Sequence, residues 1–317
     1  MHRRTLLRLG GGLALAAASG RAAGAASGPV RIGWLRGPND ITTGKARGTI
    51  EAALAGKGAS VQWIGPYAAA APALEAMNAG AIDVTAGSST ASVTGMSGGV
   101  PLVIYAYQRI AAGAEAILVQ QDSPIRTLAD LAGKTVAVNR GGTGEYLLMR
   151  ALSHNEIDPA TVKRAYLAPA DSGASFARGH VDAWATWDPF VTIALATYGA
   201  RILTDGAGIG SENAVTLMAS RDFVAGRRDL LQVLFATNLA DNRWAQAHPA
   251  EAGTIWAQAM GLPGALSAAI GRNNAVPTTG LSDRSVAEIK GVAEWYAASK
   301  ITPRLADVEA GIVKLAG

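Results

Sequence analysis

Three short loops carry residue types that bind anions, and each follows a β-like run. Residues 136–144 read VAVNRGGTG and pass from a strand-like run through glycines and a threonine into a helix-like run. Residues 87–90, GSST, stand in the same context, and residues 36–39, RGPN, follow the first strand-like run. Backbone N–H groups at a helix start point outward with partial positive charge, so loops of this kind can cradle anions.

The glycine loop at residues 141–144 alone leaves two interpretations open, a tight connection or an anion cradle. It lacks the lysine of the phosphate-binding pattern G-x-x-x-x-G-K-[ST] and does not complete G-x-G-x-x-G, so a nucleotide site is not indicated. In open α/β sheets ligands bind at the carboxyl ends of strands, where the other two loops add hydroxyls and a guanidinium. None of the loops offers a base and nucleophile pair, and the group therefore predicts binding rather than catalysis.

Other catalytic and metal patterns are weak. Residues 95–99 match G-x-S-x-G, but a helix-like run precedes them and a strand-like run follows, so we expect Ser97 to be a turn serine. His154, His180 and His248 are scattered without metal-ligand spacing. The chain has no cysteine, which excludes disulfides, thiolate zinc sites and cysteine nucleophiles. We expect no catalytic residue, no metal and no cofactor.

Residues 1–25 have the form of an export signal rather than the basic start of a cytoplasmic protein. An arginine pair at residues 3 and 4 precedes a weakly apolar stretch at residues 9–18 and a small-residue site at residues 23–25. This order is typical of a cleaved signal peptide, and the paired arginines indicate the twin-arginine (Tat) route. No cysteine is present for a lipid anchor, so we expect a soluble periplasmic protein.

The positive charge of the chain belongs to this leader. The formal net charge is +4, and removing the four arginines of residues 1–25 from the 28 basic residues leaves 24, against 24 acidic ones. A neutral mature chain does not indicate a nucleic-acid partner.

The rest of the chain alternates β-like and helix-like runs, which predicts an α/β fold with largely parallel sheets. The strand-like runs are residues 30–34, 61–64, 82–86, 101–107, 114–119, 135–139 and 183–186, and helix-like runs include residues 44–55 and 70–79. After about residue 221 the strands stop. Loop-like runs at residues 108–113 and 204–210 bracket a coherent α/β block. We therefore expect one lobe from residues 29–108 plus 207–317, and a second lobe from residues 112–204.

Several motifs resemble those of periplasmic alkanesulfonate-binding proteins. They include VDAWATWDPF at residues 181–190, the run at residues 119–152, YLAPAD at residues 166–171 and MGLP at residues 260–263. The pattern Asp-Ala-Trp-Ala-x-Trp-Asp-Pro is specific to the sulfonate, taurine and nitrate branch. The resemblance covers nearly the whole mature chain. It implies a two-lobe type II clamshell, each lobe a mostly parallel sheet flanked by helices, with two hinge crossovers.

The resemblance also implies that the loops at residues 141–146 and 87–90 and the apex of the first strand face the ligand. The expected ligand-binding residues are Arg36, Gly37, Ser88, Ser89, Thr90, Gly142, Thr143, Gly144, Glu145, Trp187 and Asp188. Trp184 and Trp187 could wall the organic part of a ligand or be core aromatics. Glu145 is a departure from the family pattern: it either turns outward or pairs with the cationic part of a zwitterion such as an aminosulfonate.

The implied function is capture of small organic sulfonates for sulfur uptake and their delivery to the permease of an ABC transporter. Taurine, nitrate, a heterocyclic vitamin precursor or another small organic ligand remain alternatives. The opposing interpretation is an enzyme on the same scaffold. A desulfinase of this architecture uses a cysteine, and the lack of cysteine in this chain argues against that interpretation. We expect a monomer that meets a membrane permease and a small organic anion, with no nucleic acid.

Overall fold

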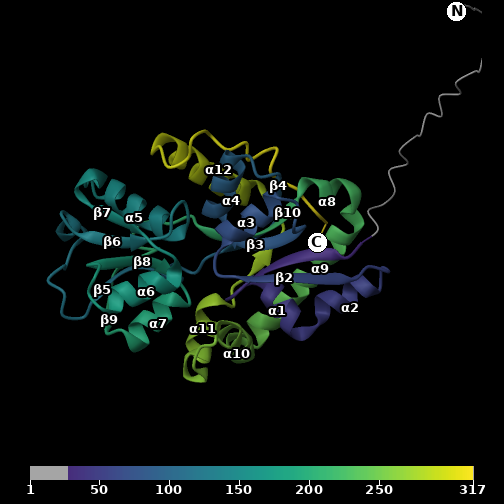
Figure 1. Ribbon diagram of the computed structural model, residues 1–317, viewed down its shortest axis with the longest axis horizontal. Helices are drawn as coiled ribbons and strands as arrows, with labels where there is room; N and C mark the ends of the chain where they lie inside the picture. Colours follow the sequence, from purple (N-terminus) through teal and green to yellow (C-terminus); the bar gives the residue numbers. More distant parts are fainter. Residues whose placement is uncertain (1–27, 317) are drawn as a thin grey trace, which may run out of the picture.

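The structure is a computed structural model that describes residues 28–316, and the signal peptide expected at residues 1–25 lies outside the described residues. Two sheets lie side by side, each covered by helices on both faces (Figure 1). We term each sheet with its helices a lobe. The strands of the first lobe are β1 (Val30–Leu35), β2 (Val61–Tyr67), β3 (Val84–Ser88), β4 (Leu102–Arg109), β10 (Ala214–Ser220) and β11 (Thr278–Thr279), in the order β11-β4-β10-β3-β1-β2. Those of the second lobe are β5 (Glu115–Gln120), β6 (Thr135–Val138), β7 (Lys163–Tyr166), β8 (Ala183–Trp187) and β9 (Ala200–Asp205), in the order β7-β6-β8-β5-β9.

Both sheets are mixed, which corrects the expectation that they are mostly parallel. β1 pairs in parallel with β2 and β3, and β6 with β7 and β8, but β10 runs antiparallel to β3 and β4, and β5 antiparallel to β8 and β9. Parallel neighbours need a long crossover. The strands β5 and β10 instead follow the short segments 110–114 and 206–213, by which the chain passes from one lobe to the other and back.

The helices cover both faces of each sheet. Around the first sheet they are α1 (Asp40–Arg47), α2 (Thr49–Ala55), α3 (Ala70–Asn78), α4 (Ser89–Gly98), α8 (Arg221–Gly226), α9 (Arg228–Ala247), α10 (Pro249–Met260), α11 (Ser267–Asn274) and α12 (Asp283–Ala298). Around the second they are α5 (Thr143–His154), α6 (Pro169–Ala177) and α7 (Phe190–Thr197). In the first lobe one apolar cluster packs α3, α4 and α12 on one face, and another packs α1, α2 and α9 on the other. Helices thus pack on both faces of each sheet, and the carboxyl ends of β1, β3, β6 and β8 lie where the two lobes meet.

The helix expected over residues 44–55 begins earlier and is broken. Asn39 caps α1 because its side chain accepts a hydrogen bond from the Thr42 amide at 2.9 Å. Gly48 ends α1 with a left-handed φ of 70° and starts α2. The cap fixes the turn at residues 36–39, which brings the apex of β1 to the junction between the lobes.

A buried carboxyl follows this cap. Asp40 is buried to 4% exposure and accepts a hydrogen bond from Asn242 Nδ2 of α9 at 3.0 Å. Burial raises the pKa of Asp40 to about 6 from an ordinary value of 3.8. The raised pKa means that the native state keeps a proton which the unfolded chain releases. This contribution to stability is complete below about pH 4 and is lost as the pH rises through about 6.

We expect Asp40→Asn to remove this pH dependence. One pKa unit corresponds to about 1.4 kcal/mol, and a small part of the effect is already lost at pH 4, so between pH 4 and pH 7 the wild type should lose about 2 kcal/mol of stability relative to the variant. Urea denaturation of both proteins across this range measures the difference, in which the other titrating groups cancel. Two curves that stay parallel would contradict the assignment.

Candidate functional site

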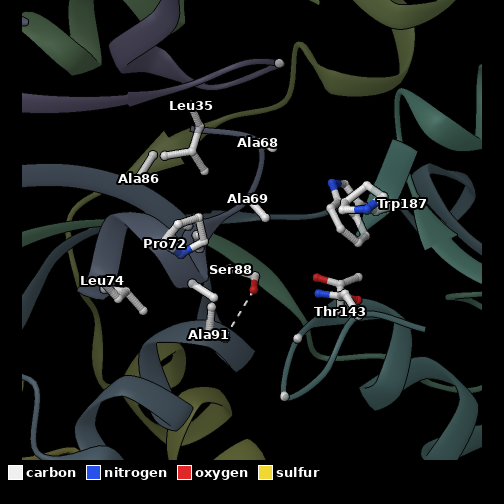
Figure 2. A pocket seen from close by; sticks show the side chains of 18 of the residues that line it. Leu35, Ala68, Ala69, Pro72, Leu74, Ala86, Ser88, Ala91, Thr143 and Trp187 are labelled. Atoms are coloured by element: carbon white, nitrogen blue, oxygen red, sulfur yellow. Dashed lines mark hydrogen bonds between the residues drawn. The ribbon is translucent and has the colours of Figure 1, made fainter. Parts of the chain in front are cut away.

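A cleft of about 710 Å³ lies between the two lobes. The first lobe contributes the apex of β1, the end of β3, and one face each of α3 and α4. The second lobe contributes residues 139–143, 166–169 and 187–190. Figure 2 shows apolar side chains of the first lobe on one side and Trp187 and Thr143 of the second lobe on the other.

Two helices begin at this cleft and face each other. Ser88 caps α4, with its Oγ accepting a hydrogen bond from the Ala91 amide at 3.1 Å, and Thr143 opens α5. Figure 2 shows Ser88 and Thr143 directed toward the same space from opposite lobes. Because the first N–H groups of a helix have no helical acceptor and lie at its positive end, this space favours an anion.

The loop before α5 is shaped by glycines. Gly141 has a left-handed φ of 61°, and a Cβ at Gly144 would lie 2.3 Å from the carbonyl oxygen of Ala185. The Gly144 amide donates to Asn139 Oδ1 at 2.7 Å. The amide of Thr143 has no acceptor among residues 28–316 and is free to donate to a ligand. The structure thus shows a tight connection, with one free amide at the cleft.

Glu145 does not enter the cleft, which corrects its place among the expected ligand-binding residues. Its side chain is buried, and one oxygen accepts the Gly141 amide at 2.7 Å. The other oxygen accepts the Tyr166 hydroxyl at 2.6 Å and the Arg164 guanidinium at 3.0 Å. The Glu145 side chain does not turn outward. Its partner cation is Arg164 of the same chain, so it is not left to pair with a cationic group of a ligand.

Ser89 and Thr90 also lie behind the cleft wall. Asn213 accepts the Ser89 hydroxyl at 3.0 Å, and its Nδ2 donates to Thr143 Oγ1 at 2.9 Å and to Glu115 Oε2 at 3.1 Å. Burial raises the pKa of the Glu115 carboxyl in this network. The bond from Asn213 thus holds the Thr143 hydroxyl at the cleft wall. Ser89 and Thr90 support the site without lining it.

Trp187 and Asp188 line the cleft at the end of β8. The Trp187 ring meets Phe190 edge to face, with centroids 5.5 Å apart. Asp188 is buried and accepts hydrogen bonds from the Thr192 amide at 3.0 Å and from Asn274 Nδ2 of α11 at 3.0 Å. Burial raises the pKa of Asp188. Asp188 therefore ties the second lobe to the first, while Trp184, at 2% exposure, belongs to the core.

Two arginines line the cleft, one from each lobe. Arg36 is exposed at the apex of β1, as expected. Sequence reasoning missed Arg140, which lines the cleft and stacks over the Tyr166 ring at 3.7 Å. The sequence signal that could have indicated Arg140 is its position, because it is a basic residue directly before the glycine loop.

Seven of the eleven expected residues line the cleft: Arg36, Gly37, Ser88, Gly142, Thr143, Trp187 and Asp188. The other four, Ser89, Thr90, Gly144 and Glu145, stand one layer behind. Ser97 is not a turn serine, because it lies in the last turn of α4 and donates to the Arg304 carbonyl at 2.7 Å.

Two negative findings concern residues 28–316 only. Nowhere in this range do three or more histidine, aspartate or glutamate side chains gather as metal ligands would. The helices of the same range include none with the length and apolar character needed to cross a bilayer.

Residues 55–252 match the family model described as NMT1/THI5 like, which covers more than half of the chain. The chain belongs to the NMT1/THI5-like family. Within solved structures it is similar to the periplasmic aliphatic sulphonate binding protein SsuA from Escherichia coli, at 28% identity and a TM-score of 0.80 over 91% of this chain and 94% of that one. It is also similar to the alkanesulfonate-binding protein SsuA from Xanthomonas axonopodis pv. citri bound to MOPS, at 26% identity and a TM-score of 0.83 over 91% and 99% of the two chains.

A further relative of this NMT1/THI5-like protein is the taurine-binding periplasmic protein of Escherichia coli (strain K12). The two are 29% identical over 187 residues, which is 58% of this chain and 57% of the relative. The desulfurization enzyme DSZB shares the fold at 16% identity and a TM-score of 0.67 over 90% and 96% of the two chains. The expected two-lobe α/β fold of periplasmic binding proteins is confirmed, and the more similar structures are binding proteins rather than enzymes.

We expect Arg164→Ala to destabilise the protein, because the variant leaves the buried Glu145 carboxylate without its cation. The loss should be about 2 kcal/mol, below the usual cost of breaking a fully buried pair, because Arg164 is partly exposed. Adding Glu145→Gln should restore part of this stability, which chemical denaturation can measure. Arg178→Ala, at an exposed arginine of the same lobe, is the control. A double variant no more stable than Arg164→Ala would contradict the pairing.

Proposed function

We propose that this protein is the substrate-binding component of an ABC importer, that it captures small organic sulfonates, and that it delivers them to a membrane permease for sulfur uptake. The observation that carries the proposal is the junction of two helix N-termini, two arginines and apolar walls in one cleft. A sulfonate brings three charged oxygens and an organic group, which are what these two kinds of wall would bind. The relatives named for aliphatic sulfonates support this ligand class.

The donors are sufficient for capture without chemistry. Hydrogen bonds to a charged group contribute roughly 1.5–3 kcal/mol each. About four of them, from the Thr143 amide and hydroxyl, Ser88 and one guanidinium, would give about 8 kcal/mol, which corresponds to micromolar binding. The chain has no cysteine, and among the cleft-lining residues there is no base paired with a nucleophile. We therefore propose a binding protein and not a desulfinase-like enzyme.

Taurine is the second candidate, and the arrangement of carboxylates disfavours it. The Glu145 oxygens are occupied by donors of the chain, and those of Asp188 accept hydrogen bonds from α7 and α11. Glu75, an exposed residue of α3, is the remaining acid that lines the cleft. An ammonium group near the cradle would thus meet guanidinium groups rather than acceptors. Nitrate would leave the apolar walls unused.

The domain organisation and location are part of the same proposal. Residues 29–108 with 207–317 form one lobe and residues 112–204 the other, a division supported by the two sheets and the short segments between them. Ligand binding would favour closure of the lobes about those segments. Residues 1–25 would act as a Tat-type signal, and the mature protein would work as a monomer in the periplasm.

Binding measurements on the protein without residues 1–25 test this function. Alkanesulfonates should raise the melting temperature by mass action, with micromolar affinity by calorimetry, and taurine, sulfate and nitrate should bind more weakly. The combined variant Arg36→Ala and Thr143→Ala should bind at least tenfold more weakly while the free protein stays folded, whereas Arg178→Ala should bind normally. Unchanged affinity in the combined variant would reject the site, and tighter binding of taurine would reject the ligand class.

A further inference from the structure

Asn213 is a buried residue at the end of the second of the two segments by which the chain passes between the lobes. We term these segments, residues 110–114 and 206–213, the first and second crossovers. Asn213 is 1% exposed, and its side-chain and backbone polar groups all have partners within the chain. These partners lie on two sides, at the wall of the cleft and at the first crossover.

On the cleft side, the Asn213 side chain bonds to the first residue of each helix that begins there. Its Nδ2 donates to Oγ1 of Thr143, at the start of α5, at 2.9 Å. Its Oδ1 accepts the hydroxyl of Ser89, at the start of α4, at 3.0 Å. Because α4 belongs to the first lobe and α5 to the second, one amide group joins the two lobes at the cleft wall.

On the other side, Asn213 joins the second crossover to the first. Its Nδ2 also donates to Oε2 of Glu115, the first residue of β5, at 3.1 Å, and its backbone carbonyl accepts the amide of Ile110 at 3.3 Å. Glu115 is buried to 2% exposure, where a carboxyl group is costly without donors. A change in the angle between the crossovers would therefore displace Asn213 and, with it, the hydroxyl of Thr143.

The set of bonds explains why an asparagine stands here. Two N–H donors and one acceptor on a short side chain are the inventory of asparagine. Glutamine carries the same groups one methylene farther out. Aspartate has the same shape but no N–H group, and in its ionised form it would place a second negative charge beside Glu115. Alanine would remove one partner each from Ser89, Thr143 and Glu115.

We propose that Asn213 is a positioning residue for anion capture, which holds the Thr143 hydroxyl at the cleft and couples its position to the two crossovers. This inference rests on the proposed function. Asn213 acts through Thr143, because Thr143 lines the cleft and Asn213 does not. A ligand that binds Thr143 would favour one arrangement of the crossovers, and by linkage that arrangement would favour the ligand.

A double-mutant cycle on the affinity for butanesulfonate, in the protein without residues 1–25, tests the proposal. We expect Asn213→Ala to weaken binding about tenfold, within the usual range for coupled sites. Thr143→Val removes the hydroxyl that Asn213 holds, so the two losses should not add. The double variant should bind within about twofold of the weaker single variant. Thr143→Ser retains the hydroxyl, and in this background Asn213→Ala should again cost about tenfold.

Asn238→Ala is the matched control for the loss of a buried amide. Asn238 is 0% exposed and accepts the Tyr105 hydroxyl at 3.1 Å, but it belongs to α9 and does not line the cleft. Its variant should keep the affinity within about twofold, because distant sites act independently. If Asn213→Ala does not fold, Glu115→Gln is added to every member of the cycle, since it removes the buried carboxyl that loses a donor.

The distance between the lobes measures the coupling to the crossovers. Because the chain has no cysteine, spin labels can be attached at Lys57→Cys in the first lobe and Arg178→Cys in the second, both exposed positions. Saturating butanesulfonate should shift the distance distribution of the labelled protein. With Asn213→Ala added, the shift at saturation should be smaller, because the bound ligand no longer acts on the crossovers through this side chain.

The outcomes separate this inference from the function on which it rests. If the wild type binds sulfonates and Asn213→Ala binds them equally well, the inference is overturned and sulfonate capture stands. Losses that add in the cycle, an equal loss in Asn238→Ala, or the same distance shift with and without Asn213→Ala would also overturn it. If the wild type binds no sulfonate, the proposed function and the role of Asn213 both fall.

Discussion

The Glu145 carboxylate stands in the first turn of α5, at the same helix end that opens the cleft. If it faced the cleft, it would repel the anion that the free amides there attract. Tyr166, Arg164 and the Gly141 amide instead hold both of its oxygens inside the second lobe. The same contacts fix the loop, so this acid also shapes the segment in which it lies. The donors of the cleft depend on this arrangement.

The two lobes meet at the carbonyls of this loop. Thr94 of α4 donates to the Gly141 carbonyl at 2.8 Å, and Tyr296 of α12 donates to that of Gly142 at 3.3 Å. On another side of the cleft, Asn274 bridges to Asp188. Opening of the lobes would separate these pairs, and a ligand between Ser88 and Thr143 would add contacts that favour the closed arrangement. These hydrogen bonds would thus link the proposed anion site to any opening of the lobes.

The features that sequence reasoning found are local, and those that it missed depend on distant partners. A loop that joins a strand to a helix is readable from a few adjacent residues, and parts of both such loops, residues 87–88 and 141–143, line the cleft. The direction of β10 is not local, because it is set by the return of the chain from the other lobe. The burial of Glu145 depends on Arg164, 19 residues away. The resemblance to a family could supply the fold, but not this departure from its pattern.

The most direct test of the central claim observes the cradle itself. In an amide-proton NMR titration of the protein without residues 1–25, an alkanesulfonate should shift the Thr143 amide strongly, because this donor lacks an acceptor within residues 28–316. The Gly141 and Gly144 amides, already held by Glu145 and Asn139, should shift less. Binding that leaves the Thr143 amide unmoved would contradict the account, since the anion would then be held elsewhere.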